Sequence, residues 1–334
     1  MQNKIDLQNK TIAISRTDSI GDVVLTLPMC IWLKEYNPTC KVVFVGRAYT
    51  APVVKICSAV DVFYDWDEVA AQPPVMQAQT LKSWGIDVFV HVFPDKEIAK
   101  MVKKAKIAHR VGTSHRSYHL VTCNHRINFT RKKAEEHEAQ LNFHLLKDMG
   151  CAALPELKEI QQWIKTVQPE ALNQEKFGNY LGQEKRIVLH PKSKGSALEW
   201  DLMNYMKLAE SLAEKGHKVL FTGTEAEGNL FRNQIPKHPN IQDLSGVFSL
   251  AEFMSFLANV DLVVGCSTGP LHLASIFGTP VVGLYPSVRP MHPGRWQPIG
   301  ENVHVLVDEK SDKKRKQLEI SLASVEQKCL EVLD

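Results

Sequence analysis

The segment Ser267–Pro270 has the residue types of an anion site and lies between an apolar strand-like run and a helix-like run. The first backbone N–H groups of a helix have no partner within the helix, so they point at whatever lies above the preceding turn. A serine or threonine here could cap the helix, Pro270 suits its first turn, and Gly269 lets a ligand approach the backbone. Because such turns also occur without ligands, the segment alone leaves open an empty turn and a diphosphate site.

Asp22 is the second residue whose position could do chemistry. It ends the turn Ser15–Asp22, which follows a short apolar strand and precedes an apolar helix. The turn has one glycine, no dinucleotide fingerprint and no Walker lysine. An acid at a helix N-terminus is commonly a cap or a first-turn acid favoured by the helix dipole, and the spacing alone favours that interpretation. The alternative is a general base that removes a proton from an acceptor hydroxyl.

Two loops of the second half could contact a phosphorylated ligand. The loop 190–200 carries Lys192, Ser193 and Lys194 and can cradle phosphate, although a solvated loop has the same composition. Glu227 stands near the start of the next predicted helix. It could bind ribose hydroxyls, as acids do in other nucleotide folds, or be a first-turn helix acid.

Strand-like and helix-like runs alternate along two successive halves of the chain. Strands are predicted at 11–15, 41–45, 60–64, 87–92, 186–190, 218–222, 241–244, 262–264 and 281–284. Helices are predicted at 21–36, 51–58, 96–104, 135–149, 201–215, 225–234, 249–259 and 313–333. This alternation predicts two doubly wound, Rossmann-like α/β domains with the ligand cleft between them. We predict a first domain at 1–170, a second at 180–312, and a terminal helix at 313–334.

Composition narrows the class of protein. Hydrophobic residues at 44% and charged residues at 23% are typical of a soluble globular chain, and a net charge of +3 argues against a general nucleic-acid binder. The seven cysteines form no Cys-x-x-Cys pair, which fits reduced thiols in a cytosolic protein. No signal peptide, membrane-spanning run or metal-ligand spacing is found, so we expect neither metal nor cofactor. We interpret Asp65-Trp66-Asp67 as a polar loop after a strand.

The segment Lys100–Arg116 is the densest basic stretch of the chain. Such a run is usually a solvated face. A phosphorylated or carboxylated acceptor, or an anionic membrane surface, would be the alternative partner.

Several motifs taken together resemble one family. They are Arg16-x4-Gly21-Asp22-Val23-Val24-Leu25-Thr26-Leu27-Pro28, His109–Gly112, His190-Pro191 with Gly195-Ser196 and Trp200, Leu244-Ser245-Gly246, Ser267-Thr268-Gly269-Pro270-x-His272-Leu273-Ala274, and Gly278-Thr279-Pro280-Val281-Val282. In this order, from about Ile12 to Val307, the chain is similar to the lipopolysaccharide heptosyltransferase family, glycosyltransferase family 9.

The resemblance implies a two-domain GT-B fold whose second domain binds an ADP-sugar, usually ADP-heptose, and whose first domain binds the inner core on lipid A. Transfer would invert the anomeric centre without a catalytic metal. Asp22 lies at the family's Gly-Asp position, which implies the general base. The terminal helix would cross back to the first domain. The protein would be cytoplasmic and peripheral at the inner membrane, without nucleic-acid partners.

The predicted site follows from these correspondences. For the acceptor we predict Arg16, Ser19, Arg110 and Arg116. For the donor and its nucleotide we predict Lys192, Ser193, Lys194, Glu227, Phe248, Ser267, Thr268, Gly269, Pro270 and His272.

Two positions depart from the family pattern. Ser267 stands where many members have an aspartate, and Leu198 stands where many have a lysine. Lys192 or Lys194 could supply the missing charge. The departures keep two alternatives open, the same fold with another nucleotide-hexose donor and a non-catalytic sugar-nucleotide-binding homologue. A nicotinamide dehydrogenase is disfavoured because no dinucleotide fingerprint is present.

Overall fold

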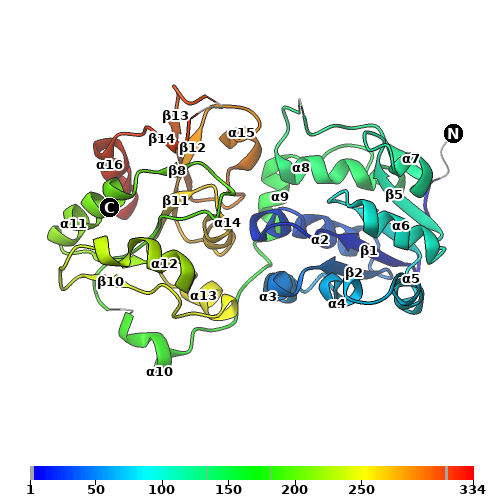
Figure 1. The fold of residues 1–334 in the computed structure, drawn as a ribbon, viewed down its shortest axis with the longest axis horizontal. Helices are drawn as coiled ribbons and strands as arrows, with labels where there is room; N and C mark the ends of the chain where they lie inside the picture. The colour runs from blue at the N-terminus through cyan, green and yellow to red at the C-terminus, as the bar shows by residue number, and fades with distance from the viewer. Residues whose placement is uncertain (1–3, 133, 181, 313–314) are drawn as a thin grey trace. The chain divides into compact units, whose positions relative to one another are not determined.

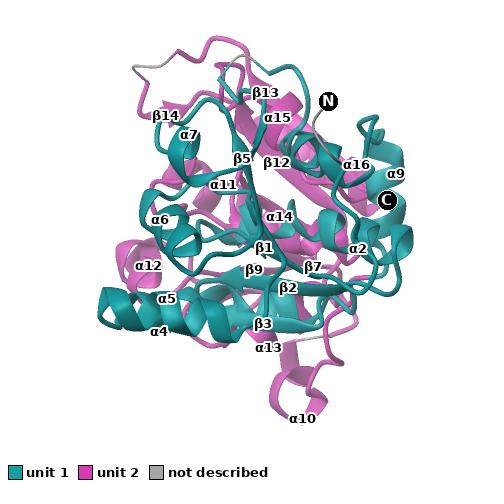
Figure 2. Ribbon diagram, turned by 90° about the vertical axis from the view of Figure 1, so that its right-hand side faces the viewer, with its two compact units in different colours: residues 1–166 teal, residues 167–334 magenta. Residues whose placement is uncertain are grey.

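The computed structural model describes residues 4–132, 134–180, 182–312 and 315–334. Contacts within the chain form two compact units that meet in sequence between Thr166 and Val167. Figure 1 follows the elements along the chain, and Figure 2 colours the two units. Within the described residues each unit contains a six-stranded parallel sheet, which confirms the predicted pair of doubly wound α/β domains.

The first sheet has the strand order β3-β2-β1-β4-β5-β6, and all five neighbouring pairs are parallel. Its strands are β1 (Thr11–Ser15), β2 (Lys41–Gly46), β3 (Val62–Asp65), β4 (Val88–His91), β5 (His109–Thr113) and β6 (His125–Ile127). The chain winds outward in one direction from β1 and in the other from β4. The carboxyl ends of β1 and β4 therefore form a topological switch point, where ligands bind in open α/β sheets.

Helices cover both faces of the first sheet. They are α1 (Ile20–Val24), α2 (Leu27–Tyr36), η1 (Ala48–Thr50), α3 (Ala51–Lys55), α4 (Trp66–Ala70), α5 (Pro74–Ser83), α6 (Lys96–Lys104), α7 (His119–Thr122), α8 (Glu138–Phe143), η2 (His144–Met149) and α9 (Leu157–Ile164). Apolar side chains of α4, α5 and α6 pack with Ala13, Val45 and Phe89 on one face of the sheet. Helices α2, α8 and α9 pack against one another.

The second sheet repeats the arrangement with the order β10-β9-β7-β11-β12-β13, again fully parallel. Its strands are β7 (Arg186–His190), β9 (Lys218–Phe221), β10 (Ile241–Asp243), β11 (Leu262–Cys266), β12 (Val281–Pro286) and β13 (Val303–Asp308), and β8 (Glu199–Trp200) pairs separately with β14 (Gln317–Leu318). Its switch point lies between β7 and β11.

The second unit also carries helices of several lengths. They are α10 (Gln174–Phe177), η3 (Gly178–Tyr180), α11 (Leu202–Glu214), α12 (Glu225–Phe231), η4 (Arg232–Gln234), α13 (Leu250–Leu257), α14 (Gly269–Ile276), α15 (Pro293–Trp296) and α16 (Leu322–Leu333). Side chains of α11 and α16 pack with Ile187, Phe221 and Val264 of the sheet, and the core includes the fully buried Trp200 and Tyr205. Fully burying one large apolar side chain contributes about 1.5–3 kcal/mol, so this packing holds the strands of the second sheet in place.

Two helices predicted as continuous are interrupted. The predicted helix 21–36 breaks at Leu25 and Thr26, where the Thr26 hydroxyl donates to the Asp22 carbonyl at 2.8 Å and Pro28 lacks the N–H that a continuous helix needs. The predicted helix 135–149 is α8 followed by the 3₁₀ helix η2. It ends where predicted, at Gly150 with φ 109°.

The end of the chain also differs from the prediction. Of the predicted helix 313–333, residues 313–314 lie outside the described residues, and β14 precedes the helix. Helix α16 begins only after Ser321, whose side chain accepts from the Ser324 N–H. It packs on α11 of its own unit. Packing of this helix on the first domain stays a prediction.

Two further segments were interpreted wrongly from sequence. Asp65-Trp66-Asp67 is the start of α4 and not a loop, because the Asp65 carboxylate caps the helix through the Asp67 N–H at 2.8 Å. The basic stretch contains β5, which was missed because histidine, arginine and glycine interrupt its apolar pattern.

Candidate active site

Asp22 lies in the first turn of α1, just beyond the carboxyl end of β1. Its Oδ1 accepts a hydrogen bond from Arg16 Nη2, and its Oδ2 accepts one from Ser19 Oγ at 2.5 Å. The structure thus brings together Arg16, Ser19 and Asp22, three of the residues singled out from sequence. Both carboxylate oxygens are oriented by donors while the side chain keeps 15% of its surface exposed. A carboxylate held in this way can accept a proton from a bound hydroxyl.

Arg16 is buried, and its guanidinium is used by the protein itself. Beyond Asp22, it pairs with Asp18 at 2.7 Å and with Glu138 at 3.3 Å, and it donates to Asn142 Oδ1 at 3.4 Å. Its side chain is 4% exposed. The predicted contact of Arg16 with an acceptor is therefore not supported by its surroundings, which fit a residue that positions Asp22.

Helix α8 provides an outer layer that holds this arginine. Glu138, 1% exposed in its side chain, also accepts from Arg131 Nε at 2.8 Å. Asn142 accepts from Arg131 Nη2 at 2.8 Å and donates to the Leu25 carbonyl at 3.0 Å, in the break between α1 and α2. Sequence reasoning missed Glu138 and Asn142. The available signal was their place on the same side of the predicted helix as its apolar positions 141, 145 and 146.

The electrostatics of this cluster depend on burial. Burial raises the pKa of the Asp18 carboxyl, and the adjacent Arg16 guanidinium opposes that rise only in part. Arg16 and Arg131 together pair with the three carboxylates of Asp18, Asp22 and Glu138. Buried charges of this kind are tolerated only when each has a partner, so the geometry of the cluster is restricted.

The other two predicted acceptor residues do not join the cluster. Arg110 is the second residue of β5, level with Ala13 of β1 through the register of β4. Its guanidinium donates to the carbonyls of Thr122, at 2.7 Å, and Ile107. Arg116 is exposed in the loop that follows β5. Only Arg116 therefore presents its charge to solvent.

In the second unit, the turn between β11 and α14 has the features of an anion site. Thr268 is the N-cap of α14 without a side-chain capping bond, and Pro270 occupies the first turn. The Thr268 hydroxyl is buried, yet it has no hydrogen-bond partner among the residues that the structure describes. A Cβ at Gly265 would lie 3.2 Å from the His190 carbonyl, so β11 and β7 approach closely here. The orphaned hydroxyl and the first amides of α14 fit an anionic group.

The loop after β7 lies on the other side of the same switch point. Glu199 accepts from Lys192 Nζ at 2.6 Å, from the Ser193 N–H at 2.8 Å and from Ser193 Oγ at 2.9 Å. Burial raises the pKa of Glu199, but these hydrogen bonds outweigh it and the net shift is downward. The Lys192 charge is thereby paired within the protein, whereas Lys194 is exposed at φ 51°.

Four predicted donor residues have different surroundings. Glu227 is buried and accepts from the N–H and hydroxyl of Thr224 at 2.7 and 2.8 Å, which is a capping box at the start of α12. Phe248 packs in an aromatic cluster, with its ring centroid 4.6 Å from that of Phe256. His272 is buried in α14. Ser267 lies near the buried Tyr285, whose hydroxyl donates to the Trp296 carbonyl at 3.0 Å.

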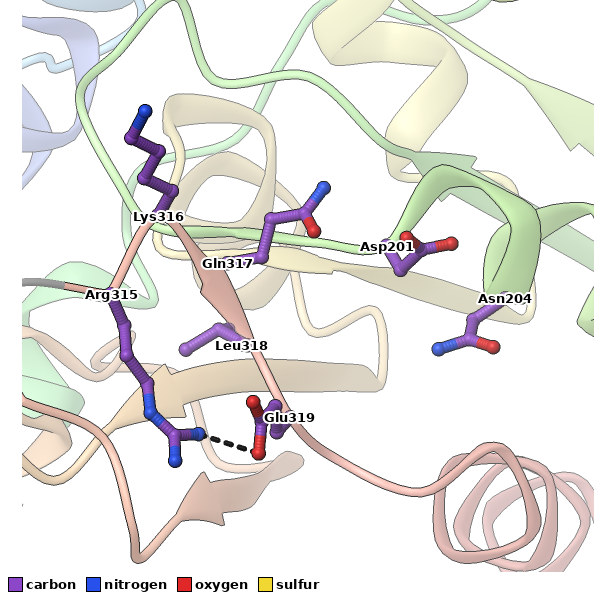
Figure 3. Close-up of a pocket in the computed structure, with 7 residues that line it drawn as sticks. All are labelled: Asp201, Asn204, Arg315, Lys316, Gln317, Leu318 and Glu319. Carbon is purple, nitrogen blue, oxygen red and sulfur yellow. Dashed lines mark ion pairs between the residues drawn. The ribbon is translucent and has the colours of Figure 1, made fainter.

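A separate hollow of about 460 Å³ lies beside β14 (Figure 3). It is lined by Asp201, Asn204 and the segment Arg315–Glu319. The Arg315 guanidinium pairs with Glu319 at 2.7 Å within it. None of the predicted donor residues lines this hollow, so it is distinct from the β7–β11 switch point.

Comparison with known proteins identifies the family. The sequence profile of glycosyltransferase family 9 (heptosyltransferase) matches residues 78–324. The chain belongs to glycosyltransferase family 9. A relative from Haemophilus influenzae, named "Putative glycosyltransferase", is 27% identical over 96% of this chain and 95% of its own length.

Two solved structures share the fold over nearly the whole chain. The glycosyl transferase family 9 protein of Veillonella parvula has a TM-score of 0.80 at 18% identity and covers 99% of both chains. The E. coli ADP-heptose lps heptosyltransferase II has a TM-score of 0.76 at 18% identity, over 97% of this chain and 98% of its own. The predicted family, fold class and glycosyltransferase activity are confirmed by these findings. No helix in the described ranges is long and apolar enough to cross a membrane.

Proposed function

We propose that this glycosyltransferase moves heptose from ADP-heptose to a core saccharide of lipopolysaccharide, with inversion and without a catalytic metal. The observation that carries the proposal is the Asp22 carboxylate, held by Arg16 and Ser19 at the switch point of the first sheet. The family assignment and the name of the E. coli relative, an ADP-heptose lps heptosyltransferase, support this donor and acceptor.

In this mechanism, Asp22 accepts the proton of an acceptor hydroxyl. The hydroxyl oxygen then forms a bond to C1 of the heptose while the bond between C1 and the diphosphate oxygen breaks. The electron pair of that bond leaves with ADP. The first amides of α14, the Thr268 hydroxyl and a lysine of the loop after β7 would stabilise the negative charge that develops on the departing diphosphate.

The Asp22→Asn variant tests the assignment of the base. It keeps the shape of the side chain but cannot accept a proton, so we expect kcat to fall by roughly 10²–10⁴-fold. Affinity for ADP should remain within about twofold, because the proposed nucleotide site lies in the second unit. Steady-state transfer to purified core acceptor and calorimetric titration of ADP measure both quantities. Near-normal turnover would overturn the role of Asp22.

Ser267 and Leu198 keep another nucleotide-hexose donor as the second candidate, since many family members have an aspartate and a lysine at these positions. A thermal-shift comparison of ADP, UDP and GDP distinguishes the two, because only a nucleotide that binds the folded state raises Tm. Stabilisation by UDP or GDP alone would replace ADP-heptose. Donor binding without transfer to any core acceptor would instead indicate the non-catalytic homologue.

A further inference from the structure

Exposed large aliphatic side chains of the first unit's described residues lie on two helices. In the described part of this unit, the exposed large aliphatic residues are Val75 and Met76 of α5 and Leu120 and Val121 of α7, with exposed fractions of 70%, 49%, 53% and 67%. Scattered single exposures are ordinary, but two adjacent pairs on helices that both pack against α6 (Lys96–Lys104) indicate a binding surface.

Helix α6 lies between these two pairs and is basic on its outer side. It buries Ile98, Met101 and Val102 against the sheet and exposes lysines at positions 96, 100, 103 and 104, a spacing that places all four on one face. The exposed Glu97 is paired with Lys100 at 2.8 Å, so it offsets one charge of the four. We call the four aliphatic residues and these four lysines the basic-apolar face.

Contacts between the helices connect the parts of this face. Val75 and Lys104 line the same surface hollow between α5 and α6. At the other end of α6, the Tyr118 hydroxyl donates to the Pro94 carbonyl at 2.7 Å, which ties the start of α7 to the start of α6. Arg126 Nη1 donates to the Leu120 carbonyl at 3.0 Å and adds a further cation. Helices α5, α6 and α7 follow one another along the teal unit in Figure 2.

We propose that the basic-apolar face docks on an anionic lipid bilayer, with the lysines at the headgroups and the aliphatic pairs at the boundary with the acyl chains. Apolar contact combined with positive charge is the recognition chemistry of membrane-surface elements. A nucleic-acid partner would match the lysines but leave the aliphatic pairs unexplained. Helix α6 begins at the sheet edge where Asp22 lies, so docking would bring a lipid-anchored acceptor to that edge. This last use rests on the proposed function, whereas the docking does not.

Sedimentation of the 334-residue chain with lipid vesicles tests the docking. The vesicles contain phosphatidylglycerol and phosphatidylethanolamine at about 3:7, with purely zwitterionic phosphatidylcholine vesicles as the comparison. The wild type should bind the anionic vesicles, and its binding should weaken as NaCl is raised from about 0.1 to 0.5 M. Each basic residue near such a surface is worth about fivefold in affinity, so K103Q/K104Q should weaken binding roughly 30-fold. L120S/V121S should weaken it at least about tenfold.

Matched variants in the second unit serve as controls. K207Q/K237Q and L230S change exposed residues of the same types and should bind as the wild type does. Equal binding by all variants, equal binding to zwitterionic vesicles, or no binding by the wild type would each overturn the proposal. The proposal would also be overturned if the wild type were an oligomer in solution and only L120S/V121S were a monomer. A second copy of the chain would then occupy the face. K103Q/K104Q should still transfer sugar to an acceptor stripped of its acyl chains. If the wild type cannot transfer sugar to such an acceptor, only the proposed function is contradicted.

Discussion

At the scale of single residues, the contacts of Arg16 distinguish two roles for its charge, binding the acceptor and positioning Asp22. Its guanidinium contacts Asp18, Asp22 and Glu138 at once. A lysine at this position has a single point charge and cannot reproduce the fork. We expect Arg16→Lys to lower kcat at least about tenfold, which corresponds to about 1.4 kcal/mol of transition-state stabilisation, while the KM for the acceptor stays within about twofold.

Steady-state kinetics with varied acceptor concentration distinguish these roles. A raised KM with normal kcat would show that Arg16 binds the acceptor, as the sequence resemblance implied. The matched control is Arg186→Lys, because Arg186 pairs with Asp261 at 2.7 Å where β7 begins, and that variant should keep normal kinetics. The kcat of Arg16→Lys is also measured at a lower temperature, at which the variant is folded. A kcat that stays low there separates the kinetic effect from a loss of folding.

The sequence predicted the inner part of this cluster but not its outer part. Arg16, Ser19 and Asp22 belong to one strand–turn–helix unit, so their proximity follows from local geometry. Glu138 and Asn142 reach Arg16 from more than a hundred residues away, which only the packing of α8 determines. For Arg110, only its charge and its place in a motif were visible in the sequence. Its use on local backbone carbonyls depends on the register of β5 and could not be read from either.

At the scale of elements, the start of α14 offers a test of the phosphate site. The Thr268 hydroxyl is buried, with no partner in the described portions of the chain, so removing it should cost the free protein little. We expect Thr268→Val to change the free energy of unfolding by less than about 1 kcal/mol, because an unsatisfied polar group is replaced by a methyl group. If the hydroxyl binds the diphosphate, ADP affinity should fall about tenfold, as titration calorimetry would measure.

The same unit contains a matched threonine with the opposite expectation. The Thr279 hydroxyl is buried and donates to the Leu257 carbonyl at 2.7 Å. Thr279→Val leaves that carbonyl unsatisfied and should lower the free energy of unfolding by about 1–3 kcal/mol without changing ADP affinity per folded molecule. Unchanged ADP affinity in Thr268→Val, or a loss of the same size in both variants, would remove Thr268 from the site.

The elements were predicted better than their interruptions. Apolar runs identified nine of the strands, since strands buried on both faces are continuously hydrophobic. Strand β5 was missed because His109, Arg110 and Gly112 interrupt its apolar pattern. These three residues serve tertiary packing. A Cβ at Gly112 would lie 2.6 Å from the His119 ring, so glycine is required there for packing and not for a turn. Such a requirement has no signature in the local sequence.

At the scale of the whole molecule, each unit contains a buried histidine that should make stability depend on pH. Burial lowers the pKa of His91 to about 3 and that of His190 to about 4. In the unfolded chain the pKa of histidine is about 6.5, so below that pH the unfolded state binds protons that the folded state does not. The free energy of unfolding should therefore fall by about 1.4 kcal/mol per pH unit for each histidine as the pH decreases. Between pH 6.5 and 5 that amounts to about 2 kcal/mol for each of these two histidines.

This window separates the histidines from the carboxylates whose pKa values are lowered. Glu199 and Glu252 have lowered pKa values, so their contributions are lost only as the pH falls below about 4.3, the value in the unfolded chain. Urea unfolding followed by circular dichroism at several pH values from 6.5 to 5 should therefore report mainly the histidines. His91→Phe keeps the buried ring shape and removes the titration, so it should flatten the dependence of the first unit by about 2 kcal/mol across the window. The control is His115→Gln, which changes an exposed histidine and should keep the wild-type dependence of the free energy of unfolding on pH. If the first unit of the wild type were equally stable at pH 6.5 and 5, His91 would titrate in the folded protein and the prediction would be wrong.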